Sequence, residues 1–87
     1  MTPHHERLPD TNKLRIHLVK MLKYCEHYIS IPEEDIVLIL YLLNTEDRIL
    51  QFLKWLQPRI EVVPPQVTAV ELCGAASLIY AGRTDLP

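Results

Sequence analysis

Eight consecutive apolar residues, 36–43, constrain the fold of this chain more than any other stretch of it. The run reads Ile-Val-Leu-Ile-Leu-Tyr-Leu-Leu and lies between three acidic residues and Asn44. Successive residues of a helix differ by about 100°, so a helix over this run is apolar on every side and needs cover on every side. The chain has only 87 residues, enough for one small domain with a thin core. We therefore expect more apolar surface in the middle of the chain than its own segments cover.

The residues in front of this run decide between a helix and a buried strand. Isoleucine and valine, which are frequent in the run, favour a strand. Ser30 and Glu33, however, have the spacing of a capping box, and Pro32 between them suits the first turn of a helix. The acidic residues at 33–35 then lie where the helix dipole favours negative charge, which accounts for them without a metal or a catalytic role. These signals predict a helix over 32–43, with a buried strand as the alternative.

The segment before the run has the pattern of an amphipathic helix. Asp10 or Thr11 provides a short side-chain oxygen that suits an N-cap. The residues after them predict a helix over 11–28, because apolar residues recur on one side of it. Those apolar residues are Leu14, Leu18, Met21, Leu22, Cys25 and Ile29.

The segment after the run predicts a third helix and then a connector. Thr45 suits the N-cap of a helix over 45–57, and two acidic residues follow it in the first turn. We expect Pro58 to stop this helix, since the residue before a proline avoids helical geometry. The residues at 60–63 favour an extended conformation, so a short edge strand there is the alternative to a plain connector.

The fourth helix has the best local signal in the chain. Thr68 and Glu71 form a second capping box, with apolar residues in the flanking positions of a hydrophobic staple. Gly82 suits the C-terminal cap, which predicts a helix over 67–81.

These elements predict an all-α fold, a small four-helix domain that is expected to form oligomers. The domain covers 10–82, between a flexible tail at 1–9 and a frayed end at 83–87. The predicted core consists of Leu14, Leu18, Leu22, Cys25, Ile36, Ile39, Leu40, Leu43, Leu53, Leu56, Leu72 and Ala76.

Charge and cysteine content limit the classes of partner and the compartment. Nine basic and eleven acidic residues give a net charge of −2, without the basic excess of general nucleic-acid or membrane-surface binders. The polar residues at 1–10 lack the apolar core of a signal peptide, and no apolar run reaches the length of about 18 residues that a membrane span needs. Cys25 and Cys73 have no metal or redox spacing. We expect a cytoplasmic protein with two free thiols, and a disulfide between them is the alternative.

No motif for catalysis or cofactor binding stands out in the sequence. The only glycines are Gly74 and Gly82, and neither lies in a Gly-rich phosphate loop. Cys25 lies on the apolar stripe of its predicted helix, while His17 and His27 lie on the opposite side, which argues against a Cys–His pair. We therefore expect no catalytic residue, no metal site, no cofactor and no enzymatic activity.

DNA binding is an alternative function, because the second and third predicted helices are joined by the short break of a helix-turn-helix motif. The later helix of that motif reads base edges with its first residues. Here it begins with two acidic residues, which oppose a polyanion. The residues that would contact DNA in this alternative are Arg48, Gln51 and Lys54.

Protein–protein binding is the function that the sequence favours. Apolar residues left over after the core is filled need cover from a second copy or from a larger partner, and two-fold dimers are the commonest oligomers. We expect a regulator, an inhibitor or an assembly factor. The other alternative is a monomeric helical domain, for example an accessory protein of a phage or mobile element. The predicted contact residues are Val37, Tyr41, Phe52 and Trp55, followed by Ile16 and Val19.

Overall fold

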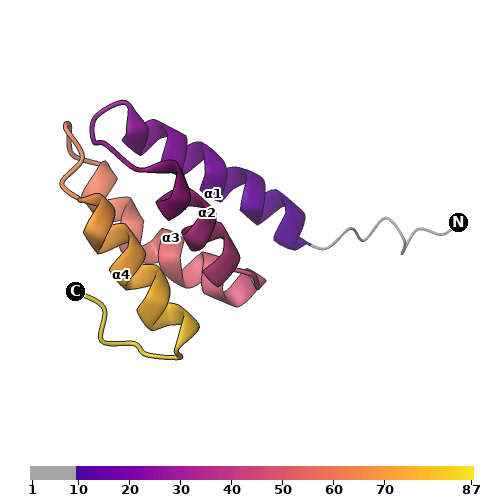
Figure 1. Ribbon diagram of the computed structural model, residues 1–87. Helices are drawn as coiled ribbons and strands as arrows, with labels where there is room; N and C mark the ends of the chain where they lie inside the picture. The colour runs from indigo at the N-terminus through magenta and orange to yellow at the C-terminus, as the bar shows by residue number, and fades with distance from the viewer. Residues whose placement is uncertain (1–9) are drawn as a thin grey trace, which may run out of the picture.

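The computed structural model describes residues 10–87, which form a bundle of helices (Figure 1). The elements are α1 (Asp10–Glu26), α2 (Glu33–Leu42), α3 (Glu46–Ile60) and α4 (Ala69–Tyr80). The prediction of an all-α chain with four helices is confirmed, and within residues 10–87 neither 36–43 nor 60–63 forms a strand. The tail predicted at 1–9 lies outside the described residues, as do the side chains of Asp10 and Thr11.

Contacts between helix ends fix the direction of the four helices. The Arg15 guanidinium, near the start of α1, donates hydrogen bonds to the main-chain oxygens of Leu40 (3.1 Å) and Leu43 (3.4 Å) at the end of α2. The Arg48 guanidinium, at the start of α3, lies 4.9 Å from the centroid of the Tyr80 ring at the end of α4. Because α3 also begins directly after α2, α1 and α3 run in the same direction, while α2 and α4 run in the opposite one (Figure 1).

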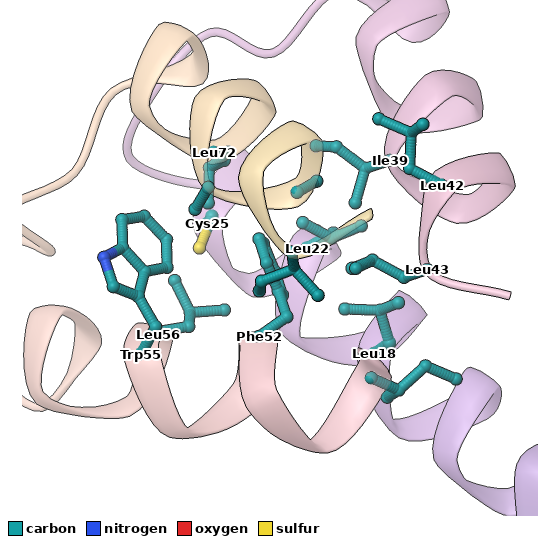
Figure 2. Packing of buried hydrophobic residues seen from close by; sticks show 14 of the residues in the cluster. Leu18, Leu22, Cys25, Ile39, Leu42, Leu43, Phe52, Trp55, Leu56 and Leu72 are labelled. Atoms are coloured by element: carbon teal, nitrogen blue, oxygen red, sulfur yellow. The ribbon is translucent and has the colours of Figure 1, made fainter. Parts of the chain in front are cut away.

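The core lies between the four helices, where α2 packs against α4, α1 against α3, and α3 against α4 (Figure 2). All the residues of the predicted core contribute, although Leu14, Ile36, Leu40 and Leu53 are only partly buried. Several further residues are buried that were not in the predicted core, namely Ile31, Leu42, Ile49, Phe52, Trp55, Val67, Ala75 and Ile79.

Two of the predicted helix caps are confirmed. The Thr45 hydroxyl accepts a hydrogen bond from the backbone N–H of Arg48 (3.2 Å) at the start of α3. At the start of α4 the Thr68 hydroxyl accepts from the Glu71 N–H (3.1 Å), and the Glu71 carboxylate accepts from the Thr68 N–H (2.9 Å).

Gly82 ends α4 as the sequence predicted. Its φ of +81° lies in the left-handed region that favours glycine. The Gly82 N–H donates to the Ile79 oxygen (3.0 Å) and the Arg83 N–H to the Leu78 oxygen (2.8 Å), which satisfies the last carbonyls of the helix in a Schellman motif.

The capping box predicted at Ser30 is wrong. The N-cap of α2 is Pro32, and no side chain caps it. A cap at Ser30 would require Ile31 to be helical, a conformation that the following proline disfavours. Ile31 instead turns into the core, where only 7% of its surface is exposed.

The stop predicted at Pro58 is also wrong, because α3 continues through this residue to Ile60. A proline in the last turn removes one intrahelical hydrogen bond, and little of the helix remains after it to be disrupted.

The segment 83–87 was expected to fray, but it packs back on the bundle. It forms no helix, yet Leu86 packs against the core and the Pro87 main-chain oxygen accepts hydrogen bonds from α3. The Arg83 guanidinium pairs with the Asp85 carboxylate within this segment, with N···O distances of 2.6 and 3.0 Å.

Candidate interaction surface

The outer side of α2 carries three large apolar side chains that the rest of residues 10–87 leaves exposed. Val37, Leu38 and Tyr41 are exposed over 60%, 41% and 66% of their surface, and we call these three residues the α2 face. Positions that differ by three or four residues share one side of a helix, so the three form one patch. The opposite side of the same helix is buried at Ile39 and Leu42, which expose 0% and 9% of their surface.

The remaining sides of α2 are covered by its two neighbours. Near its start, Asp35 lies against the half-buried Cys73 of α4, and burial together with this carboxylate raises the pKa of the Cys73 thiol. At its end, Arg15 of α1 binds the last carbonyls. The bundle therefore covers three sides of α2 and leaves the α2 face open.

The neighbouring edge of α1 extends this apolar surface. Val19 lies one turn after Arg15, on the side of α1 that faces α2, and is half-buried. Ile16 lies further outward, with 57% of its surface exposed. Four of the six predicted contact residues, namely Ile16, Val19, Val37 and Tyr41, therefore belong to one side of the bundle.

Charges of opposite sign border this surface on its two helices. Lys20 and Lys23 follow Ile16 at helical spacing on α1, and both are exposed. Glu34 precedes Leu38 by one turn on α2 and is exposed as well. None of these three charged groups pairs with another described side chain. The surface thus has a basic border on α1 and an acidic border on α2.

Phe52 and Trp55 were predicted as partner contacts, and the structure places both in the core instead. Phe52 has no exposed surface and Trp55 has 8%. Their ring centroids are 5.6 Å apart. Helix α3 contacts both α1 and α4, so apolar residues on two sides of it are buried within the bundle. The assignment of these two residues to an interface is therefore wrong.

Leu38 belongs to the α2 face but was absent from the predicted contacts. Helical spacing contained the signal, because Glu34, Leu38 and Tyr41 recur on one side of α2 and the acidic residue marks that side as the solvent side. The eight-residue apolar run hid this distinction among equally apolar neighbours.

A groove lies between α1 and α3 and has a volume of about 350 Å³. Its walls are mostly apolar, with polar groups at the rim. We call it the α1–α3 groove, and its lining residues are His17, Met21, Tyr24, Leu53, Leu56, Gln57, Ile60 and Glu61.

The residues of the DNA-binding alternative are largely engaged within the chain. The Arg48 guanidinium donates to the Asn44 side-chain oxygen (2.7 Å) and stacks on Tyr80. The Gln51 amide donates to the Asp47 carboxylate (2.8 Å), which leaves Lys54 as the exposed candidate. The contacts of Arg48 with Asn44 and of Gln51 with Asp47 compete with any contact of these two side chains to a base or a phosphate.

Among the described residues, no group of three or more His, Cys, Asp or Glu side chains is placed so that it could hold a metal ion. Both cysteines are free, and burial raises the pKa of the Cys25 thiol. None of the helices in residues 10–87 combines the length and the apolar character needed to cross a membrane.

Comparisons of the chain with models of protein families, with curated proteins and with solved structures find no match.

Proposed function

We propose that this chain is a non-enzymatic helical interaction module that associates with a second copy of itself through the α2 face. The observation that supports this most is the joint exposure of Val37, Leu38 and Tyr41 on one side of α2. Water contact with so much apolar surface is unfavourable, by roughly 25 cal/mol for each Å². Contiguous apolar patches of this kind mark interaction sites on soluble proteins.

The charged borders favour a second copy as the occupant. A two-fold axis places the same patch of each subunit against the other. A two-fold axis that lays the edge of α1 on the start of the partner's α2 brings the basic border with Lys20 and Lys23 against the acidic border with Glu34 of the partner subunit. Complementary charges at the rim of an interface select the partner and its orientation.

Tyr41 is the anchor of the proposed interface. It is the most exposed residue of the α2 face, and tyrosine is enriched among the residues that dominate binding energy. A stable interface covers roughly 800 Å² on each partner. The α2 face therefore forms its centre, and Ile16, Val19 and the charged borders supply the periphery.

The cytoplasm is the proposed compartment. Free thiols at Cys25 and Cys73 suit the reducing conditions found there.

A matched pair of variants tests the self-association. Leu38 and Leu50 are exposed over 41% and 44% of their surface, but Leu50 lies on α3, away from the α2 face. We expect light scattering to give the native chain a mass near twice 10.1 kDa at high concentration. Leu38→Lys should give the monomer mass at the same concentration, while Leu50→Lys should remain a dimer.

Two results would contradict the proposal. One is a native chain that stays monomeric over the whole accessible concentration range, which would favour the monomeric alternative. The other is a dimer that Leu38→Lys leaves intact. Circular dichroism of both variants checks that the helices are retained.

A further inference from the structure

The α1–α3 groove is a second apolar site, separate from the α2 face. Met21 and Tyr24 on α1 and Leu53 and Ile60 on α3 line it and are only half-buried. A volume of about 350 Å³ lies within the range of pockets that bind ligands. The apolar side chains of its walls therefore have room for a partner's side chains between them.

One end of this groove is negatively charged. Because α1 and α3 run in the same direction, both of their carboxyl ends lie at the same end, and each carries about half a negative charge from its helix dipole. Glu61 adds a carboxylate there, and the Gln57 amide donates a hydrogen bond to it (3.2 Å). This end of the groove is suited to a cation.

The basic residues in the last turns of these helices face elsewhere. Lys23 is on the side of α1 that carries Ile16, toward the α2 face. The Arg59 guanidinium lies 4.3 Å from the centroid of the Trp55 ring and donates to the Pro87 main-chain oxygen (2.6 Å). Neither residue neutralises Glu61, since no ion pair joins it to another described side chain.

The length of the groove matches two turns of a helix. On α1 its wall extends from His17 to Tyr24, and at 1.5 Å per residue this is about 10 Å. An amphipathic helix that docks in a groove contacts it with residues spaced over the same distance.

We propose that the α1–α3 groove binds an amphipathic helix of a partner protein, with apolar side chains between α1 and α3 and a lysine or arginine at Glu61. This inference goes beyond self-association and is independent of it, because the groove and the α2 face share no residue. In a dimer formed through the α2 face, each subunit would then bind one partner helix in its own groove.

Two synthetic peptides of about 14 residues provide the probes. Both carry leucines on one side at helical spacing. One has a lysine at each end of that stripe, so that either direction of binding brings a lysine to Glu61, and the other has glutamates there. We expect saturable binding of the lysine peptide, about tenfold tighter than that of the glutamate peptide, when followed by fluorescence anisotropy.

Variants of the full chain complete the test. Glu61→Lys should abolish the preference for the lysine peptide or reverse it. Glu46→Lys, which changes an exposed carboxylate at the other end of α3, should leave it unchanged. Tyr41→Lys should also leave it unchanged, because Tyr41 belongs to the α2 face.

Three outcomes overturn the inference. They are the absence of saturable binding, equal affinity for the two peptides, and loss of peptide binding in Tyr41→Lys. The third would assign the peptide to the α2 face. Light scattering of the native chain without peptide measures the dimer mass separately, so a failure of this inference and a failure of self-association can be told apart.

Discussion

The indole Nε1 of Trp55 donates a hydrogen bond to the main-chain oxygen of Pro87, 3.0 Å away. Arg59 donates to the same oxygen and stacks on the indole ring, so two residues of α3 hold the last residue of the chain. Leu86 beside it packs against the core. Trp55 therefore stabilises the fold, and its burial removes it from the exposed surface.

Trp55→Phe tests this role. The substitution keeps an apolar ring but removes the N–H donor, and loss of one hydrogen bond should lower the free energy of unfolding by about 1 kcal/mol. Urea denaturation followed by circular dichroism measures it. The mass in solution should stay the same as that of the native chain. A change in oligomeric state would indicate that Trp55 contributes to an interface after all.

The charged borders of the α2 face predict a charge-swap result. Lys20→Glu and Glu34→Lys should each weaken the proposed dimer, since each puts like charges together, while the double variant should recover most of the affinity. Each surface ion pair contributes about 0.2–1 kcal/mol to the free energy of association, and each pair occurs twice in a two-fold dimer.

Sedimentation equilibrium at low and high salt measures these affinities. The differences between the variants should shrink at 1 M salt, where the screening length is about 3 Å. If the double variant is weaker than both single variants, the two borders do not meet across the interface.

The two capping motifs in the sequence predict opposite results for one kind of substitution. Thr68→Ala should lower the free energy of unfolding by about 1 kcal/mol, because the Glu71 N–H loses its acceptor. Ser30→Ala should leave it nearly unchanged, because no side chain caps α2. Thermal denaturation of the native chain and the two variants measures both changes in stability. Equal destabilisation of the two variants would contradict the start of α2 at Glu33.

Burial of Cys25 predicts a loss of stability in alkaline solution. Burial raises the pKa of this thiol above its ordinary value of 9.0, so the folded chain keeps a proton that the unfolded chain releases. The stabilisation from this group is complete below pH 9 and decreases as the pH rises through 9, since the unfolded state then binds fewer protons.

Urea denaturation between pH 7.5 and 10 measures this dependence, and Cys25→Ala separates it from the titration of lysine and tyrosine. The variant should be less stable at pH 7.5, because a buried side chain is shortened, but should lose less stability on going to pH 10. If the free energy of unfolding fell equally with pH in both chains, the thiol would ionise as readily in the folded state as in the unfolded state, against the prediction.

The helices could largely be predicted from the sequence because their signals are local. Thr45, Thr68 and Gly82 act through their own backbone neighbours, which the sequence displays directly. The signal at Ser30 is also local but ambiguous, since Pro32 suits a first helical turn and yet disfavours a helical Ile31.

The exposed apolar side of α2 could be predicted only in part, because burial depends on residues that are distant in the sequence. Val37 and Tyr41 were expected to be exposed because they remain after the predicted core is filled, whereas Leu38, one turn after the acidic Glu34, was not. No local pattern indicates that Pro87 covers Trp55, or that α1 and α4 enclose α3 from two sides. Residues on a helix that is apolar on several sides are assigned correctly only when its neighbours are placed.

The chain contains one tryptophan, and its indole lies directly under the segment that closes over α3. Its emission should shift to the red when Pro87 moves away, before the helices themselves unfold. The molecule thus carries an intrinsic optical probe for the docking of its last residues, and no added label is needed to follow that step.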